Sequence, residues 1–255
     1  MQLQGKTIVI TGTSSGIGAE VAKLARFQGA TVIGVDRNDP SLTLDGFVKA
    51  DLGSTAAIEA AVAQLPAHID ALCNIAGVPG TADGDLVARV NYLGLRHLTE
   101  QVLPRIPRGG SIVNVASILG AEWPQRLAEH KALAAASGFE AGAHWLRDHP
   151  VPHATCYQYF KEALIVWNAT QSQEWFLGKG VRMNCVAPGP VFTPILGDFV
   201  QMLGQERVQA DAHRMLRPGF ADEIAPVIAW LCSDAARWVS GVNIPVDGGL
   251  ASTYL

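Results

Sequence analysis

The feature that most constrains the fold is an alternation of short β-branched runs with helix-forming stretches along the whole 255-residue chain. The expected strands lie at 6–11, 30–36, 47–50, 69–74, 111–116, 181–187 and 242–246. The expected helices lie at 16–28, 55–65, 85–106, 155–177, 195–203 and 222–233. Strands that are apolar throughout and alternate with helices are typical of a doubly wound α/β fold, in which helices cover both faces of a parallel sheet.

The same alternation argues for a single domain over residues 1–255. The chain is 49% hydrophobic, enough for a sizeable core, and contains no Pro/Ser-rich linker and no run of like charge. The segment 121–153 departs from the pattern, and we interpret it as a helical insertion.

Charge and hydropathy narrow the possible partners. The net charge of −4 gives no reason to expect a nucleic acid or an anionic membrane surface. No apolar run approaches the roughly 18 residues that would suggest a membrane span. The chain leads directly into its first strand without a signal peptide, and its four cysteines form no CxxC pair. These observations predict a cytoplasmic protein with reduced thiols and a small-molecule substrate.

A glycine-rich run follows the first strand. It reads Thr-Gly-Thr-Ser-Ser-Gly-Ile-Gly over residues 11–18, and a helix is expected immediately afterwards. Glycines at this junction let the backbone turn tightly and approach a pyrophosphate, which the helix N-terminus stabilises. The run therefore predicts a dinucleotide site, to which we assign Gly12, Ser14, Ser15, Gly16, Ile17 and Gly18.

Asp36 ends the second strand, eighteen residues after Gly18. A carboxylate at this position is suited to bind the adenosine ribose hydroxyls and would repel a 2′-phosphate. We therefore expect NAD rather than NADP. The adjacent Arg37 leaves NADP open as the alternative.

A second chemical signal is Tyr157 followed by Lys161 in an expected helix. Residues at i and i+4 share a helix face, so both side chains can point into one site. A phenol has an unperturbed pKa of about 10, too high for a base near neutrality. We expect the ammonium, together with a positively charged nicotinamide ring, to lower the pKa of Tyr157.

Two further polar residues lie where this chemistry needs them. Ser117 follows the strand 111–116, at the carboxyl edge where α/β sheets place ligands, and can hold a substrate oxygen beside Tyr157. Asn91 is a polar residue among apolar neighbours in the helix 85–106. Because asparagine is unfavourable inside a helix, this position suggests a specific role.

Taken together in this order, the motifs resemble those of the short-chain dehydrogenase/reductase family over nearly the whole chain. The resemblance implies a Rossmann-like fold and a catalytic tetrad of Asn91, Ser117, Tyr157 and Lys161. Tyr157 would exchange the hydroxyl proton, Ser117 would orient the oxygen, Lys161 would bind the nicotinamide ribose, and Asn91 would hold a water in a proton relay. The further cofactor residues that the resemblance implies are Asp51, Leu52, Asn74, Ala76, Gly77, Pro188, Gly189, Val191 and Thr193.

Two departures from the common family pattern suggest a particular branch. The interval from Asn74 to Asn91 is short, and the forty residues from Ser117 to Tyr157 form a long one. Both resemble the branch of bacterial coniferyl-alcohol dehydrogenases and 3α-hydroxysteroid dehydrogenase/carbonyl reductases. We expect an aromatic or allylic alcohol of the coniferyl type as substrate, with a 3α-hydroxysteroid as the alternative. A regulatory module that senses NAD without turnover is an alternative of another class.

The remaining side chains suggest a substrate pocket but no metal site. Four histidines of the insertion show no compact ligand spacing, so we expect no bound metal. The apolar residues near the predicted site could form a substrate pocket or belong to the core. The candidates are Leu119, Phe192, Ile195, Leu196 and Phe199.

The insertion carries a prediction about assembly. Residues 127–137 and 139–147 are rich in helix formers and are expected to form two short helices joined at Gly138. They would lie beside the helix of Tyr157, whose outer face pairs with its copy in most of the family. The family resemblance implies a homodimer or homotetramer. We expect the hairpin to block that pairing, so that the late part of the chain, around Trp230, Trp238 and the strand 242–246, forms a two-fold dimer instead. The alternative is that the hairpin covers the substrate cleft as a lid.

Overall fold

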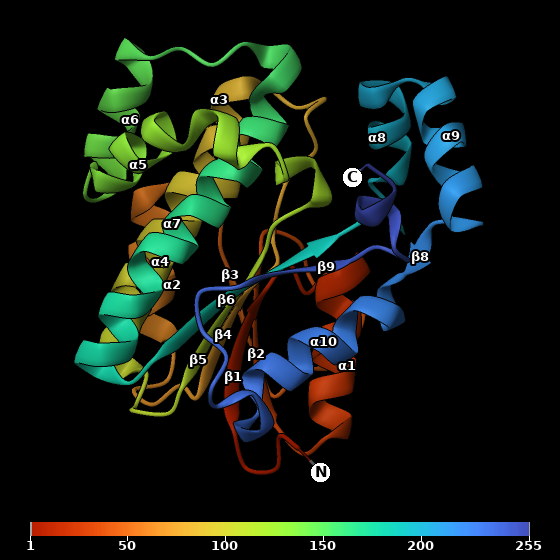
Figure 1. Cartoon of the computed structure of the whole chain (residues 1–255). Coiled ribbons are helices and arrows are strands. Elements are labelled where there is room, and N and C mark those ends of the chain that lie inside the picture. Colours follow the sequence, from red (N-terminus) through yellow and green to blue (C-terminus); the bar gives the residue numbers. More distant parts are fainter. Residues whose placement is uncertain (1, 255) are drawn as a thin grey trace.

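The centre of the computed structural model, which describes residues 2–254, is a seven-stranded parallel sheet (Figure 1). The strand order β3-β2-β1-β4-β5-β6-β9 confirms the predicted doubly wound fold. Strands β4, β5 and β6 are buried at every position, as expected for strands of a parallel sheet that is covered on both faces. The strands are β1 (Thr7–Thr11), β2 (Thr31–Asp36), β3 (Gly46–Lys49), β4 (Ala71–Asn74), β5 (Ser111–Val115), β6 (Arg182–Pro188) and β9 (Asn243–Val246).

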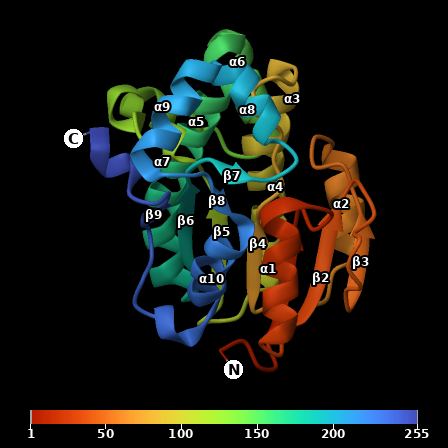
Figure 2. The same ribbon diagram turned by 90° about the vertical axis from the view of Figure 1, so that its right-hand side faces the viewer.

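Helices cover both faces of this sheet. On one face lie α1 (Gly16–Phe27) and α10 (Ala221–Cys232), which pack against each other and face the viewer in Figure 2. On the other face lie α2 (Thr55–Gln64), α4 (Leu95–Val102) and α7 (Cys156–Lys179). None of the helices described within residues 2–254 is both long and apolar enough to span a membrane.

The sheet changes direction between its first and fourth strands. From β1 the chain moves to one side through β2 and β3, then returns to place β4 on the other side of β1. A crevice therefore opens at the carboxyl ends of β1 and β4, the position at which open α/β sheets bind ligands.

The expected helix 85–106 is interrupted rather than continuous. It consists of α3 (Gly84–Ala88), a π-helical turn (Arg89–Gly94), α4 and a 3₁₀ turn (Leu103–Arg105). A Cβ atom on Gly94 would lie 1.9 Å from the Leu52 carbonyl oxygen, so only glycine lets this turn approach the loop after β3. The π-helical turn contains Asn91, consistent with the frequent location of such turns at functional sites.

The insertion forms the two predicted helices, α5 (Leu127–Ala135) and α6 (Phe139–Asp148). They are joined at Gly138, whose φ of +81° favours glycine. In Figure 1 the pair lies against α7, and α5 is in direct contact with that helix. No residue of 121–153 lines the cavity described below, so the hairpin is not a lid over the cleft.

Buried polar contacts attach this hairpin to the helices below it. Glu162 of α7 is fully buried and accepts a bidentate hydrogen bond from Arg126. A ring nitrogen of His130, also fully buried, lies 2.8 Å from the same carboxylate. The Arg96 guanidinium, on α4, donates to three carbonyl oxygens at the end of α5, capping that helix as a cation can.

A second helical pair lies over the carboxyl edge of the sheet. It comprises α8 (Leu196–Leu203) and α9 (Gln205–Met215), joined at Gly204, and stands above the strands in Figure 2. The pair is flanked by β7 (Val191–Phe192) and β8 (Gly219–Phe220), which form a separate two-stranded sheet. Of these elements the sequence predicted only α8.

Candidate active site

A cavity of about 290 Å³ lies at the carboxyl edge, where the topology predicts a ligand. The loops after β1, β2, β3, β4, β5 and β6 contribute to its wall, together with α7, α8 and α9. The predicted cofactor residues all line this cavity except Asn74.

The glycine run forms one end of the cavity. Gly12 has a φ of +79°, and a Cβ atom there would lie 2.8 Å from the Ala76 nitrogen. A Cβ atom on Gly18 would lie 2.1 Å from the Gly12 carbonyl oxygen. Side chains are thus sterically excluded, leaving a backbone cradle in front of the N-terminus of α1. This geometry fits a dinucleotide pyrophosphate.

The side chain of Asp36 lines the part of the cavity where the sequence predicts the adenosine, which we call the adenosine end. Its two carboxylate oxygens accept hydrogen bonds from the backbone nitrogens of Ser14 and Asn38, both at 2.9 Å. The carboxylate is therefore held in place at the end of β2, with only 8% of the residue exposed. Arg37 also lines the cavity, as does Asn38, which the sequence did not single out.

Thr11, another residue not singled out, joins the two loops of the crevice. Its hydroxyl accepts hydrogen bonds from the backbone nitrogens of Ile75 and Ala76, at 2.9 and 3.0 Å. Asn74 lies below the cavity floor, and its amide donates to Thr99 and Asn114. The expectation that the Asn74 side chain contacts the cofactor is therefore wrong, because that side chain points into the α4 side of the core.

Tyr157 and Ser117 meet at the centre of the cavity. Both side chains line the cavity, and the Ser117 hydroxyl accepts a hydrogen bond from the Leu119 nitrogen at 3.2 Å. Burial raises the pKa of the Tyr157 phenol well above its usual value, and the nearby Ser117 hydroxyl offsets this effect only in part. In the protein alone, Tyr157 is therefore a protonated acid.

Lys161 lies beneath this tyrosine, one helical turn along α7. Its ammonium nitrogen is 5.6 Å from the centre of the Tyr157 ring and donates to the Val115 carbonyl oxygen at 2.7 Å. Burial lowers the pKa of Lys161 to about 8. The lowering of the Tyr157 pKa expected from Lys161 is absent from the protein alone: burial sets the direction of the shift, and the ammonium, 5.6 Å from the ring centre, does not contribute to it.

Asn91 stands one layer behind the cavity wall. Its side-chain oxygen accepts from the Val78 nitrogen at 2.8 Å, and its amide nitrogen donates to the Val78 carbonyl oxygen at 2.9 Å. Asn91 is fully buried, whereas Val78 and Gly77 line the cavity. The asparagine therefore fixes the backbone of the wall that it supports.

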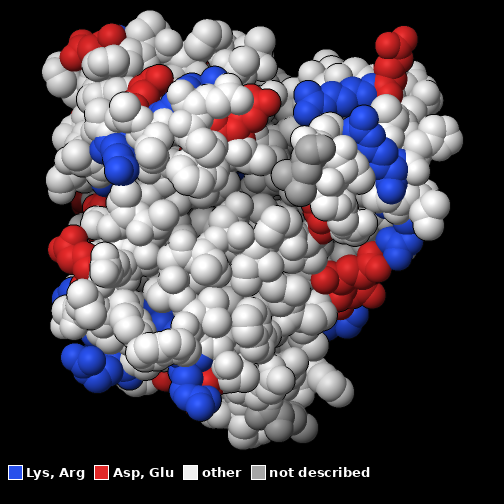
Figure 3. All heavy atoms as spheres, in the orientation of Figure 1, with Lys and Arg blue, Asp and Glu red and all other residues white. Residues whose placement is uncertain are grey.

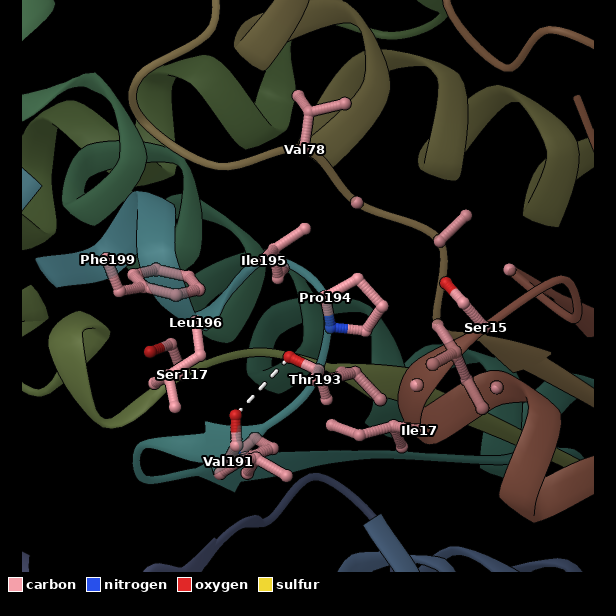
Figure 4. Close-up of a pocket in the computed structure, with 18 of the residues that line it drawn as sticks. Ser15, Ile17, Val78, Ser117, Val191, Thr193, Pro194, Ile195, Leu196 and Phe199 are labelled. Atoms are coloured by element: carbon pink, nitrogen blue, oxygen red, sulfur yellow. Dashed lines mark hydrogen bonds between the residues drawn. The ribbon is translucent and has the colours of Figure 1, made fainter. Parts of the chain in front are cut away.

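The other end of the cavity is apolar. Leu119, Ile195, Leu196 and Phe199 line it, and the Phe199 ring meets the Tyr157 ring edge-on at 5.1 Å. Figure 4 shows Ile195, Leu196 and Phe199 on the side of Ser117, with Ser15 and Ile17 opposite. Two wall residues that the sequence missed are Leu203 and Val208.

Phe192 is a correction to the predicted substrate pocket. It lies outside the cavity, is 47% exposed and stacks on Phe220 with the ring centres 5.1 Å apart. Successive residues of a strand point to opposite sides, and in β7 it is Val191 that faces the cavity.

Comparison with known proteins defines the class of this chain. Residues 6–132 match the family model described as short chain dehydrogenase, and residues 145–251 match the model described as Enoyl-(Acyl carrier protein) reductase. The chain belongs to the short-chain dehydrogenase/reductase family. It is an oxidoreductase that uses a nicotinamide cofactor, which excludes the alternative of a non-catalytic sensor.

Individual relatives are similar over their whole length. The chain is 67% identical to the coniferyl-alcohol dehydrogenase of Pseudomonas sp. (strain HR199 / DSM 7063), with all of both chains covered. It is 33% identical to the 3-alpha-hydroxysteroid dehydrogenase/carbonyl reductase of Comamonas testosteroni, over 95% of each chain. The crystal structure of the 3-alpha-hydroxysteroid dehydrogenase from Pseudomonas sp. B-0831, complexed with NADH, superposes with a TM-score of 0.81 at 30% identity, over 98% of each chain.

Proposed function

We propose that this enzyme oxidises aromatic allylic alcohols of the coniferyl type to the aldehydes, with NAD as the hydride acceptor. The observation that carries the proposal is the 67% identity to a coniferyl-alcohol dehydrogenase along the entire chain. The apolar wall of Leu196 and Phe199 beside Tyr157 supports it, because a flat aromatic substrate needs such a surface.

The proposed chemistry uses four side chains. Tyr157 takes the proton of the substrate hydroxyl, and Ser117 holds the same oxygen. A bound oxidised nicotinamide supplies the hydride acceptor and, through its positive charge, favours ionisation of the nearby phenol. Lys161, below the phenol, adds a second positive charge and could reach the nicotinamide ribose. Asn91 acts through Val78 and is a positioning residue in this scheme.

The preference for NAD rests on Asp36. Its carboxylate lines the adenosine end and is fixed by two backbone hydrogen bonds. A 2′-phosphate there would meet a negative charge that cannot swing away, a repulsion that costs affinity. Arg37 lies next to it and would attract the same phosphate.

A spectrophotometric screen at 340 nm tests this function against the nearest alternative. The substrates are coniferyl and cinnamyl alcohols, benzyl alcohols and 3α-hydroxysteroids, each with NAD and with NADP. Turnover of coniferyl alcohol with a higher kcat/KM for NAD is the expected result. Turnover of 3α-hydroxysteroids without cinnamyl or benzyl alcohols would overturn the substrate assignment, and a higher kcat/KM with NADP would overturn the role assigned to Asp36.

We also propose a two-fold homodimer in the cytoplasm. Helix α5 packs against the first half of α7, where His130 and Glu129 contact Glu162 and Tyr159, so two copies of this half could not approach to the 8–10 Å of packed helices. The late part of the chain instead offers the edge strand β9 and Trp238, which is 85% exposed. Light scattering would give the mass, and a tetramer with paired α7 helices in a crystal structure would overturn the proposal.

A further inference from the structure

One charged side chain reaches the substrate end of the cavity from the helical pair α8–α9. Asp211 lines the wall, and only 5% of the residue is exposed. Among the described residues of the wall, the other charged ones are Asp36, Arg37 and Asp51 at the adenosine end and Lys161 beneath Tyr157. Burying a carboxylate on an otherwise apolar surface costs free energy unless the carboxylate has partners, so Asp211 needs groups that bind it.

The partners of Asp211 hold one of its two oxygens. Oδ1 accepts a hydrogen bond from the Tyr254 hydroxyl and lies 3.6 Å from an Arg214 guanidinium nitrogen. The Arg214 guanidinium in turn lies over the Tyr254 ring, 4.6 Å from its centre. Among residues 2–254, no hydrogen bond to Oδ2 is formed, which leaves an acceptor in a carboxylate that is already oriented.

The surrounding wall connects this acceptor to the reacting centre. Phe199 touches the Tyr157 ring, Leu203 follows one helical turn later, and Val208 lies one turn before Asp211 on α9. Apolar side chains of α8 and α9 therefore line the same cavity wall as the catalytic hydroxyls and this carboxylate. Basic side chains are visible on the surface of the pair α8–α9 in Figure 3. Arg207 and Arg214 of α9 are both exposed.

We propose that Asp211 is a specificity residue that accepts a hydrogen bond from a hydroxyl group at the end of the substrate remote from the reacting carbon. The inference rests on the proposed function and deepens it: a coniferyl-type alcohol carries a phenolic hydroxyl at that end. An ionised carboxylate only accepts hydrogen bonds, so it favours a phenol and disfavours a methyl ether or a distal ketone. A steroid with a distal ketone would be rejected for the same reason.

The test compares coniferyl alcohol with its 4-O-methyl ether, in which a methoxy group replaces the hydroxyl donor. For each enzyme form the ratio of the two kcat/KM values is measured, so a general loss of activity cancels. The wild type should prefer the phenol by about tenfold or more, as a charge-assisted hydrogen bond allows. Asp211→Ala should bring the ratio close to one. Tyr254→Phe is the matched control, since it removes the partner but keeps the acceptor, and it should retain most of the preference.

The possible outcomes distinguish the role of Asp211 from the proposed function. Equal kcat/KM for phenol and ether in the wild type would overturn the role of Asp211 while leaving the proposed function intact. That role is overturned equally if Tyr254→Phe abolishes the preference as fully as Asp211→Ala, because Asp211 would then serve only to tie the chain end to α9. No turnover of either compound by the wild type would overturn the proposed function, and the role of Asp211 with it.

Discussion

The two ends of the cavity are built in different ways. The cofactor end consists of backbone at the carboxyl edges of β1, β2 and β4, with glycines in contact with neighbouring backbone and loops joined by the Thr11 hydroxyl. The substrate end consists of side chains on α8 and α9. Two side-chain hydrogen bonds attach α8 and α9 to other parts of the chain: Thr81 donates to Asp198 of α8 at 2.9 Å, and Tyr254 donates to Asp211 of α9.

This difference implies that the cofactor end is fixed in shape, whereas the substrate end can vary. A backbone cradle tolerates almost no substitution, because any added atom collides with main chain. A wall of apolar side chains held by single hydrogen bonds can change shape at a cost of about 1 kcal/mol for each bond. The fold can therefore keep one cofactor while changing its substrate, and substitutions at the two ends should differ in size and in kind.

The largest effect is expected at the junction of the two ends. Tyr157→Phe should retain NADH binding, measured by fluorescence, but lose turnover by roughly 10²–10⁴-fold or more, because only the proton-transferring oxygen is removed. Retention of more than about a tenth of the wild-type kcat would contradict the role of Tyr157.

Lys161 should make the stability of the cofactor-free protein depend on pH. Its pKa is near 8 when folded and near 10.5 when unfolded, so between these values only the unfolded chain binds the proton. The free energy of unfolding should therefore rise from pH 8 to pH 10.5, relative to Lys161→Met, by about 3 kcal/mol. Urea unfolding of both proteins at several pH values measures this difference, and parallel curves would refute it.

Gly18→Ala should damage the cofactor end alone. The new methyl group would meet the Gly12 carbonyl oxygen, and overpacking of about 1–3 kcal/mol corresponds to a Kd for NAD roughly 10- to 100-fold higher. Gly197→Ala on α8 is the matched control, because nothing lies within 4 Å of that position, and it should bind NAD normally. Equal Kd values for the two variants, by calorimetry, would mean that the cradle is not rigid.

Asp36→Ala should change which cofactor is used rather than how well the enzyme works. Removal of the carboxylate relieves the repulsion of a 2′-phosphate, so the ratio of kcat/KM for NAD over NADP should fall by about tenfold or more. Asp39→Ala is the control, since Asp39 is outside the cavity and paired with Lys49. A ratio unchanged in both variants would shift cofactor selection to Arg37.

The smallest effect is expected at the substrate end. Thr81→Val removes the hydrogen bond to Asp198 with little change in shape, so α8 should be less firmly held. Loss of one neutral-donor bond predicts a substrate KM about two- to tenfold higher with kcat nearly unchanged. Thr170→Val is the control, because that hydroxyl bonds only within α7. A fall in kcat at constant KM would show that Thr81 acts on the chemistry instead.

The sequence predicted the sheet well because its signals are local. The strands lie in short, largely apolar runs, and each is present in the structure close to its expected range. Helix α9 was missed because its sequence is polar, and its one buried residue is the acid Asp211. The π-helical turn at Asn91 was missed; Gly94 at its end approaches the Leu52 carbonyl, a tertiary contact that a sequence pattern does not show.

The sequence predicted those parts of the site that follow from the order of strands and helices along the chain. Gly12, Ser117 and Tyr157 follow or precede regular elements, so sequence position alone brings them to one edge. Side-chain direction was harder: Phe192 was placed in the pocket although it is Val191 that faces it. Asp211 could not be found because its partner Tyr254 is 43 residues away.

The attachment of the hairpin to Glu162 bears on how the enzyme responds to dilution. A catalytic helix that is supported by a second copy loses that support when the protein concentration falls below the dissociation constant of the dimer. Here the residue after Lys161 is held by Arg126 and His130 of the same chain, and a tether of a few dozen residues keeps the local concentration of that support fixed. The support of the catalytic helix at Glu162 therefore comes from the same chain and does not depend on the protein concentration.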